Sequence, residues 1–246
     1  MRVAVLSDIH ANRPALEAVL EAIGETEAEE LWCLGDLVGY GAEPDGCTEL
    51  VRERCAVTLC GNHDLAVLGE LDITTFSESA AAAVRWTREA ASEETVAYLR
   101  SLAPQGSRAE VGLFHASPRD PVWEYVLSLD QAEAGIDAMA ERVGLIGHSH
   151  VSLFFTRPAA KRPTYAHGAQ AGDGASVEIA SGRWLLNPGS VGQPRDGDSR
   201  AAWLELDTET WSARYHRVPY DIEAAAGAIL EAGLPSPLAD RLQIGR

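Results

Sequence analysis

Short apolar runs that alternate with helical patterns are the feature of the first 150 residues that most constrains the fold. The runs have the length and β-branched content of buried strands, and helical periodicity separates them. A chain that alternates strands and helices in this way folds into a mainly parallel sheet with helices packed on its faces. The expected strands are residues 2–6, 31–34, 56–59, 111–114 and 143–146, and the expected helices are residues 13–23, 44–54, 75–102 and 131–141.

The pattern changes after His150. Strands are expected at residues 151–156, 176–180, 183–186, 201–206 and 211–218, with hairpin turns at 180–183 and 207–210 and a final helix over residues 221–231. These strands predict an antiparallel sheet that follows the parallel one. No internal repeat or linker interrupts the chain, so a single domain of residues 1–246 built from two sheets is expected.

The longest expected loop spans residues 157–176. It is rich in proline and glycine, and long loops in compact domains often serve a function. Two interpretations stay open, namely a lid over a functional site and a surface excursion without a role.

Composition narrows the class of partner. The formal net charge of -17 repels the backbone of long nucleic acids, whose binding relies on lysine and arginine. A small phosphorylated substrate is therefore expected, and long nucleic acid is not. The absence of a basic leader and of an apolar stretch of about 18 residues predicts no membrane association and a cytoplasmic location. Nothing in the composition indicates an oligomeric state.

Each apolar run in the first 150 residues gives way to a short polar motif. Loops at the carboxyl ends of parallel strands converge on one crevice, so these motifs are expected to meet. A D-x-H or H-x-H motif at an extended strand end directs both polar side chains to one side, because side chains alternate with a period of two. The motifs are Asp8-Ile9-His10, Gly35-Asp36, Gly61-Asn62-His63-Asp64, His115 and Gly147-His148-Ser149-His150.

The residue types in these motifs are those of metal ligands. Carboxylate, imidazole and amide groups together suit Mn, Fe or Zn better than Ca. One ion takes about four to six ligands and this set is larger, so two divalent ions that share a bridging carboxylate are expected. Each motif alone also occurs in ordinary loops and turns. Five of them in succession, each after a strand, favour the binuclear site.

The order of these motifs resembles that of the calcineurin-like metallophosphoesterase superfamily. The resemblance runs from Asp8 to His150 and extends more weakly through residues 187–192. Residues 35–41 are similar to the G-D-x-V-G-Y-G segment of the small prokaryotic predicted phosphodiesterases within that superfamily. Two positions depart from wider family patterns. Residues 38–41 differ from the Asp-Arg-Gly of protein phosphatases, and Phe114 stands where a glycine usually precedes the fourth-strand histidine.

The resemblance implies a four-layer α/β/β/α sandwich, in which helices flank two mixed sheets. It implies that Asp36 bridges two divalent ions, with Mn expected first and Fe, Zn, Ni or Mg as alternatives. It also implies that His63 contacts the substrate and protonates the leaving group, and that Asp64 orients His63. One ion would be bound by Asp8, His10 and His150, and the other by Asn62, His115 and His148.

The expected function is that of a binuclear metal-dependent phosphoesterase. The two ions would activate a bridging hydroxide for attack on phosphorus and neutralise the phosphate oxygens. A phosphodiesterase acting on a small phosphorylated or nucleotide substrate is the first hypothesis, with a phosphomonoesterase and a dinucleoside polyphosphate hydrolase as alternatives. A hypothesis of another class is a binding scaffold that has lost catalysis, although His63 and the whole ligand set are present.

Substrate-binding residues are expected in the loops around the metal motifs. Tyr40 follows Asp36 in a glycine-flanked loop, and Arg195 follows the last family segment; both are candidates to contact the substrate. Arginine clamps phosphate bidentately, so Arg13 and Arg119 are further candidates.

Two aromatic residues after the fourth-strand histidine have two interpretations. Trp123 and Tyr125 either wall a base-binding pocket or pack into the core. Their positions in the sequence do not decide between the two.

Overall fold

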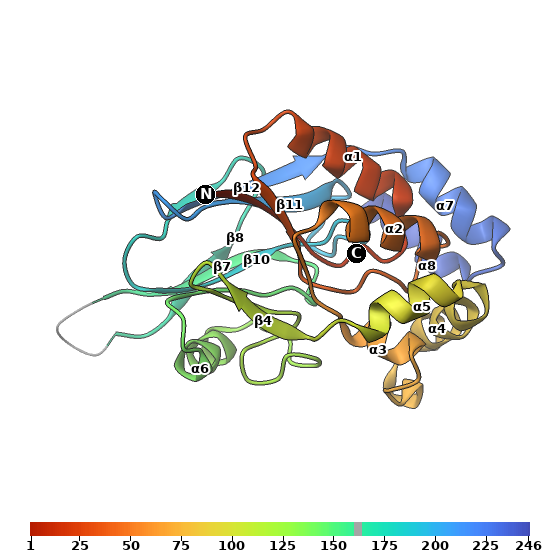
Figure 1. Cartoon of the computed structure of the whole chain (residues 1–246), viewed down its shortest axis with the longest axis horizontal. Coiled ribbons are helices and arrows are strands. Elements are labelled where there is room, and N and C mark those ends of the chain that lie inside the picture. Colours follow the sequence, from red (N-terminus) through yellow and green to blue (C-terminus); the bar gives the residue numbers. More distant parts are fainter. Residues whose placement is uncertain (160–163) are drawn as a thin grey trace.

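The computed structural model of the chain describes residues 1–159 and 164–246. Two six-stranded sheets lie face to face, and helices cover the outer face of each (Figure 1). Helices α1 (Arg13–Gly24), α2 (Pro44–Arg54) and α7 (Ile222–Glu231) lie on one side, and α6 (Leu129–Ala138) lies on the other. This is the predicted four-layer sandwich of two mixed sheets.

The first sheet joins N-terminal strands to strands from the end of the chain. Its strands, in spatial order, are β3 (Val57–Thr58), β2 (Glu30–Cys33), β1 (Arg2–Leu6), β11 (Ala201–Asp207), β12 (Ser212–Val218) and β9 (Ser176–Glu178). The first three are parallel. β11 then pairs antiparallel with β1, so that Val5 lies opposite Leu204. The sheet is therefore mixed, with the change of direction at its centre.

The second sheet has the same mixed character. Its strands, in spatial order, are β4 (Gln105–Arg108), β5 (Val111–Phe114), β6 (Val143–Leu145), β10 (Arg183–Pro188), β7 (Ser152–Arg157) and β8 (His167–Gln170). β5, β6 and β10 are parallel, whereas β4, β7 and β8 pair antiparallel with their neighbours. In this sheet the parallel strands occupy the centre, whereas in the first sheet they lie toward one edge.

The structure corrects the predicted division into one parallel and one antiparallel sheet. The strands after His150 divide between the two sheets, and each sheet combines early strands with late ones. The predicted hairpin at residues 180–183 is wrong, because β9 and β10 belong to different sheets. The hairpin at residues 207–210 is confirmed, since β11 and β12 are antiparallel neighbours.

Alternate residues of the central strands fill the two sides of each sheet. Val3 and Val5 of β1 pack between the sheets, whereas Ala4 and Leu6 pack against the helices. Successive side chains of a strand point to opposite faces, so a strand covered on both faces is apolar throughout. This double burial explains why β1 has a continuous apolar sequence.

Polar caps and prolines set the ends of several helices. Asn12 caps α1, and its Oδ1 accepts a hydrogen bond from the backbone N–H of Ala15 at 3.2 Å. Ser92 divides the stretch expected to be helical over residues 75–102 into α4 (Glu78–Ala90) and α5 (Glu93–Arg100). The α3 (Asn62–Val67), α8 (Ser236–Ile244) and 3-10 (Ile73–Thr75) helices are absent from the predicted elements. Prolines beside the start of α8 give its sequence the pattern of a loop.

The expected loop at residues 157–176 is partly a strand. Residues 167–170 form β8, which pairs with β7 at the edge of the second sheet. Residues 160–163 lie outside the described residues. The choice between a lid and a surface excursion therefore stays a prediction.

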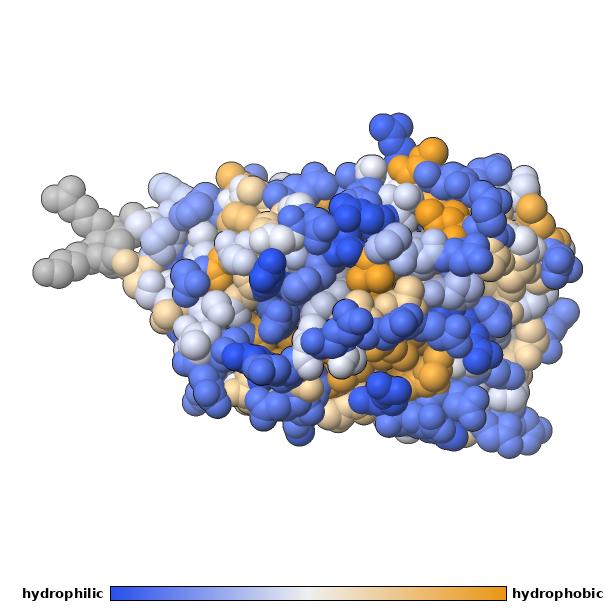
Figure 2. Space-filling model, turned by 90° about the horizontal axis from the view of Figure 1, so that it is seen from above, coloured by the Kyte–Doolittle hydropathy of each residue, from blue (hydrophilic) through white to orange (hydrophobic). Residues whose placement is uncertain are grey.

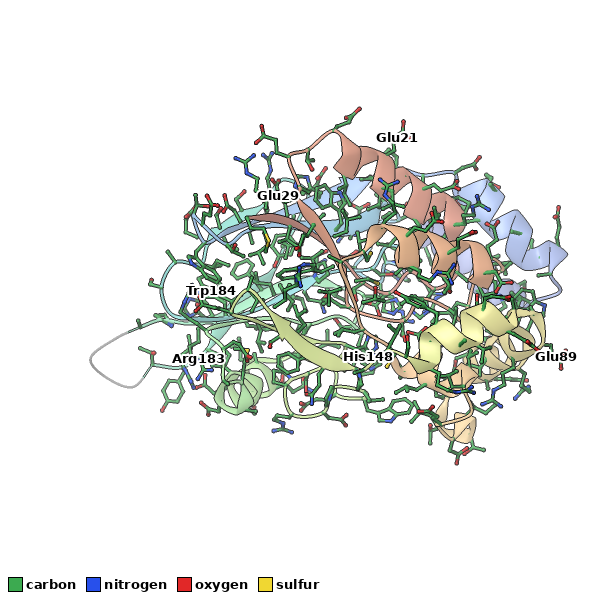
Figure 3. The ribbon with its side chains drawn as sticks, viewed as in Figure 1. Glu21, Glu29, Glu89, His148, Arg183 and Trp184 are labelled. Carbon is green, nitrogen blue, oxygen red and sulfur yellow. The ribbon has the colours of Figure 1, made fainter. Side chains whose placement is uncertain are left out.

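Figure 2 shows that the face of the molecule seen from above is mostly hydrophilic, with apolar residues in small patches. Glu21, Glu29 and Glu89 point outward into solvent (Figure 3). These glutamates contribute to the negative charge of the chain without forming a site. No helix in the described residues is long and apolar enough to span a bilayer.

Candidate metal centre

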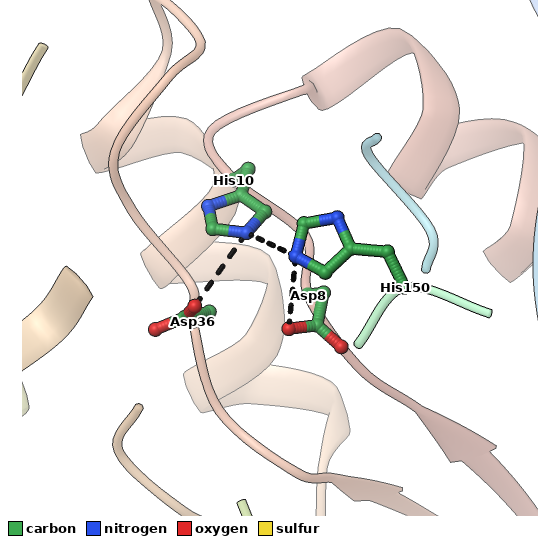
Figure 4. A group of neighbouring side chains, drawn as sticks. All are labelled: Asp8, His10, Asp36 and His150. Atoms are coloured by element: carbon green, nitrogen blue, oxygen red, sulfur yellow. Dashed lines mark hydrogen bonds and ion pairs between the residues drawn. The ribbon is translucent and has the colours of Figure 1, made fainter. Parts of the chain in front are cut away.

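A first cluster of ligand atoms lies just beyond the ends of β1, β2 and β6 (Figure 4). His150 Nε2 lies 3.4 Å from Asp8 Oδ1, and His10 Nε2 lies 3.5 Å from Asp36 Oδ2. The two imidazole Nε2 atoms are 3.1 Å apart. Each of the four residues places one ligand atom within 4.8 Å of the others. Three motifs that are distant in sequence therefore converge on one point.

A second cluster shares Asp36 with the first. His115 Nε2 lies 3.6 Å from Asp36 Oδ2 and 3.3 Å from Asn62 Oδ1. Asp36, His115 and His148 place one ligand atom each within 4.8 Å of one another. A Cβ atom at Gly61 would overlap both the Asp36 carboxylate and the His115 ring, so glycine permits this close approach. Asp36 thus occupies the place of a bridging ligand.

Phe114, which replaces the glycine usual in the family, is accommodated outside the site. Its ring belongs to the apolar cluster packed around α6, whereas His115 reaches the ligand cluster. Gly112 leaves room for the Phe114 ring, because a Cβ there would lie 2.8 Å from a ring carbon. The substitution therefore does not displace His115.

Backbone carbonyls orient three of the histidines. A carbonyl oxygen only accepts hydrogen bonds, so Nδ1 of each ring carries the proton and Nε2 keeps its lone pair. Bonds of this kind fix the tautomer and orientation of metal-binding imidazoles. The pairs are His10 with Val38 O at 3.1 Å, His115 with Leu34 O at 2.9 Å, and His150 with Gln193 O at 2.6 Å.

The lone pairs of the site fit bound cations. The Nε2 atoms of His10 and His150 are two acceptors only 3.1 Å apart, and a cation between them removes their repulsion. Burial lowers the pKa of both rings, so the imidazoles are neutral at pH 7 and available as ligands. Asp36 Oδ2 and His148 Nε2 are buried without a hydrogen-bond partner among the described residues.

The environment of the Asp36 carboxylate also favours a bound cation. Burial, with the nearby carboxylates of Asp64 and Asp8, raises the pKa of Asp36 well above its usual range. A neighbouring positive charge opposes that shift because it favours the ionised carboxylate. The donor set therefore suits two divalent ions on either side of Asp36. The other residues that would hold them are Asp8, His10 and His150 on one side, and Asn62, His115 and His148 on the other.

Five residues of the donor set have left-handed backbone conformations. This conformation costs non-glycine residues on the order of 1–3 kcal/mol, and it persists where the surroundings enforce it. Here the loops are held by backbone hydrogen bonds, such as that from His10 N to Asp36 O at 2.9 Å. The φ angles are 55° at Asp8, 51° at His10, 54° at Asp36, 62° at His148 and 59° at His150.

His63 lies beside the ligand clusters without belonging to them. Its ring packs against Tyr40 at 4.3 Å and Phe76 at 5.1 Å between centroids, and its backbone N–H donates to Asp36 Oδ1 at 2.8 Å. Its Nδ1 atom is buried without a hydrogen-bond partner among the described residues. Burial lowers the pKa of His63 well below its ordinary value. The ring is therefore neutral at pH 7.

The expectation that Asp64 orients the His63 ring is wrong. Asp64 Oδ1 accepts from the backbone N–H of Val38 at 3.1 Å, and Oδ2 accepts from that of Gly61 at 2.8 Å. Both oxygens are thus directed at loop backbone. The carboxylate ties the loop after β2 to the start of α3, and so supports the positions of Asp36 and Asn62.

A cavity of about 690 Å³ opens beside the ligands, and Tyr40 and Arg195 both line it. The Tyr40 ring lies 4.5 Å from the His10 ring. Arg195 Nη2 donates to Tyr40 Oη at 3.3 Å and to Gln193 Oε1 at 2.9 Å. Both partners are neutral, so the guanidinium keeps its positive charge toward the site.

The other two candidate arginines lie away from the cavity. Arg13 Nε pairs with Glu17 Oε1 at 2.7 Å, and Arg119 Nη2 pairs with Glu124 Oε1 at 2.9 Å. Neither residue lines the cavity. They are surface ion pairs, which contribute little to stability.

The lining also includes two aromatic residues whose role the sequence left open and two residues that it did not indicate. Trp123 and Tyr125 face the cavity, so the core-packing interpretation of these residues is wrong. Phe76 and Arg241 also line it, although neither lies near a ligand motif. Arg241 belongs to α8, more distant in sequence than any predicted site residue. Only the packing of the last helix beside the site brings it there.

A buried ion pair anchors the loop that carries Arg195. The Arg217 guanidinium pairs with the Asp196 carboxylate, and both side chains are buried. Arg217 Nη2 also donates to Ser152 Oγ at 2.9 Å, and Ser152 N donates to Asp196 Oδ2 at 3.2 Å. The network links β7 and β12, which belong to different sheets, to the residue next to Arg195.

Replacing Arg217 with methionine is expected to lower the free energy of unfolding by about 3–5 kcal/mol, because it leaves a buried carboxylate unpaired. Urea denaturation would measure the loss. Arg214→Met, at an exposed position of the same strand, is the matched control and should change stability little. Equal stabilities of the two variants would show that the buried pair does not anchor the loop.

Comparison with known proteins agrees with this geometry. Residues 1–209 match the calcineurin-like phosphoesterase superfamily domain. An uncharacterized protein of Methanocaldococcus jannaschii is 35% identical over 251 residues, covering 99% of this chain and 98% of that protein. The crystal structure of a metallophosphoesterase from Sphaerobacter thermophilus is 37% identical with a TM-score of 0.89, covering 100% of this chain and 99% of that chain.

A shorter similarity links the chain to a further enzyme. The symmetrical bis(5'-nucleosyl)-tetraphosphatase of Actinobacillus pleuropneumoniae is 37% identical over 70 residues, which cover 27% of this chain and 26% of that protein. The chain belongs to the calcineurin-like phosphoesterase superfamily, and it is a metal-dependent phosphoric ester hydrolase.

Proposed function

We propose that the chain is a phosphodiesterase that uses two divalent ions, Mn first, to hydrolyse a small phosphorylated or nucleotide substrate. When bound, the ions would activate water and neutralise charge on the phosphate oxygens. The observation that carries the proposal is the cavity of about 690 Å³, which joins the metal ligands to a largely aromatic lining. A diester needs room for an organic group on each side of phosphorus, and this volume is typical of small-molecule sites.

Residues of the chain would position the substrate and stabilise the leaving group. Neutral His63 carries one N–H, which would donate a hydrogen bond to the leaving oxygen as its negative charge develops. Arg195 would hold a phosphate oxygen, and Tyr40 and Gln193 hold its guanidinium in place.

The charge of the lining favours a diester over a monoester. A monoester carries a second negative charge and is bound best by several cationic side chains. Only Arg195 and Arg241 are cationic among the lining residues, and apolar side chains such as Leu71 and Ala80 complete the wall. The singly charged diester suits this composition better.

A dinucleoside polyphosphate hydrolase is the second candidate. The local similarity to a bis(5'-nucleosyl)-tetraphosphatase favours it. The two arginines of the lining could hold additional phosphates beside the metal centre. Release of nucleotides from diadenosine tetraphosphate by the Mn-loaded protein would support this candidate.

Steady-state kinetics on matched aryl substrates test the proposal. The Mn-loaded protein is expected to hydrolyse bis(p-nitrophenyl) phosphate with a kcat/KM about tenfold or more above that for p-nitrophenyl phosphate, a difference of about 1.4 kcal/mol in barrier. The reverse preference would favour a phosphomonoesterase. No turnover of either ester or of diadenosine tetraphosphate, with two ions bound, would favour the binding scaffold.

Replacing Arg195 with methionine is expected to raise KM for the diester about tenfold or more, because hydrogen bonds to a charged group contribute about 1.5–3 kcal/mol. Initial-rate measurements over a range of substrate concentrations check this. Arg13→Met removes a surface arginine outside the cavity and is the matched control. An unchanged KM in Arg195→Met would remove Arg195 from the substrate site.

A further inference from the structure

Three aromatic residues form one side of the cavity, and we call Phe76, Trp123 and Tyr125 the aromatic wall. The Tyr125 ring stacks on the His148 ring, with centroids 4.1 Å apart and planes 24° apart. Phe76 meets Trp123 edge to face at 5.4 Å. The wall therefore borders the candidate metal centre at His148 and at His63, so its ligand would be part of a molecule whose phosphate lies at that centre.

Two members of the wall, Trp123 and Tyr125, are exposed although they are large and partly apolar. Trp123 has 38% and Tyr125 has 42% of its surface accessible. An aromatic surface left open beside a polar site is typical of ligand contact, because covering it removes apolar area from water. The exposed rings of Trp123 and Tyr125 are therefore available to contact a ligand in the cavity.

The loop that carries Trp123 and Tyr125 is held by its own hydrogen bonds. The backbone N–H groups of Val122 and Trp123 both donate to Asp120 Oδ1 at 3.1 Å. Ser117 Oγ also donates to Glu124 Oε2 at 2.5 Å, which ties the start of this loop to the residue between Trp123 and Tyr125. A preformed wall loses little conformational entropy when a ligand stacks on it.

Positive charge lies beside the wall. Arg195 and Arg241 line the same cavity. Arg195 Nη2 donates to Tyr40 and Gln193. Arg241 Nε donates to the backbone oxygen of Arg246 at 2.6 Å. Burial and the nearby Arg195 guanidinium lower the pKa of Arg241, which is consistent with two cations facing one space. The cavity thus combines a metal centre, an aromatic surface and two guanidinium groups.

We propose that the aromatic wall binds the base of a nucleotide whose phosphate lies at the metal centre, in the cavity that Arg195 and Arg241 also line. This inference rests on the proposed function. Trp123 and Tyr125 are each more than a third exposed, so the wall would cover one face of its occupant and leave the other face open to solvent. A base tolerates this arrangement because its edges are polar, whereas an acyl chain would remain half in water. Base stacking on aromatic side chains is also tolerant of which base is present.

Equilibrium binding separates the base from the rest of the nucleotide. Calorimetric titration of the Mn-loaded protein with adenosine 5'-monophosphate and with ribose 5-phosphate compares two ligands that differ only by the base. The nucleotide is expected to bind about 10–100-fold more tightly. Trp123→Ala and Tyr125→Ala should each reduce this ratio several-fold and leave the affinity for ribose 5-phosphate unchanged. Trp123→Phe should restore most of the ratio.

Tyr165→Ala is the matched control, because Tyr165 is 85% exposed and lies outside the cavity. Equal affinities of the unmodified protein for the two ligands would overturn the inference, as would a preference for the nucleotide that survives in both alanine variants. Turnover of methyl p-nitrophenyl phosphate is measured in parallel. Absence of turnover would contradict only the proposed phosphodiesterase activity. Absence of a preference for the nucleotide over ribose 5-phosphate would contradict only the proposal that the aromatic wall binds a base.

Discussion

Asp36→Asn is expected to lower the metal content of the loaded protein from two ions to one or none, and to lower kcat/KM for a diester about a thousandfold or more. Asp36 is the one residue that both ligand clusters share. Asparagine keeps the shape and one acceptor oxygen, but it removes the charge that balances the cations. Loss of one ion removes several kcal/mol of transition-state stabilisation, and each 1.36 kcal/mol is a factor of ten in rate.

Mass-spectrometric metal analysis after loading with Mn and desalting would measure the ion content, and the same samples would be assayed. The Asp36 backbone and Oδ1 contacts can persist in the variant, since the His63 N–H can still donate to an amide oxygen. Asp130→Asn, at an exposed position of α6, is the control and should retain both ions. If Asp36→Asn also kept both ions with unchanged affinity, the bridging role would be wrong.

His63→Ala has the opposite expected pattern, with both ions retained and turnover lowered about 10²–10⁴-fold. His63 is outside both ligand clusters, and its neutral ring lies in the cavity beside them. Its loss therefore removes a hydrogen-bond donor to the leaving group without removing a metal ligand. The decrease should appear in kcat more than in KM, because the bond forms as charge develops in the transition state.

The leaving group offers a second test of this role. A substrate that releases p-nitrophenolate needs less assistance than one that releases an alkoxide, so His63→Ala should be impaired less on the aryl ester. His167→Ala, on the exposed strand β8, is the matched histidine control. Loss of metal from His63→Ala would show that the residue is a ligand, which would overturn the division of roles proposed here.

The early strands and the convergence of the polar motifs could be predicted from the sequence for a local reason. Buried central strands such as β1 are apolar throughout because both faces are covered. The carboxyl ends of neighbouring parallel strands lie at the same edge of a sheet. Residues that follow β1 and β2 therefore meet, whatever the details of the helix between them, and Asp8 and Asp36 do so here. His150 follows β6 of the second sheet, and the packing of the two sheets brings it to the same point.

The pairing of the late strands could not be predicted in the same way. β10 joins the second sheet beside β6, and β11 joins the first beside β1. Both are short apolar strands, and their side-chain alternation is compatible with either sheet. Packing of the two sheets against each other, which involves contacts distant in sequence, decides between the alternatives.

The roles of some single side chains could not be predicted from the sequence either. Asp64 adjoins His63 in the sequence, yet its carboxylate turns to the backbone of Val38 and Gly61 because those N–H groups are buried and need acceptors. Arg241 reaches the cavity only because α8 packs beside the site.

By itself, then, the sequence determined the fold class and the polar motifs that follow the apolar strands, because both are visible in local periodicity. The expectation that Asp36 is a shared ligand rested on the resemblance of those motifs to a known family. The tertiary structure alone decided how the late strands divide, which way Asp64 turns, and which aromatic and cationic residues line the cavity. Those features depend on packing between segments far apart in the chain, and no local pattern of residues encodes that packing.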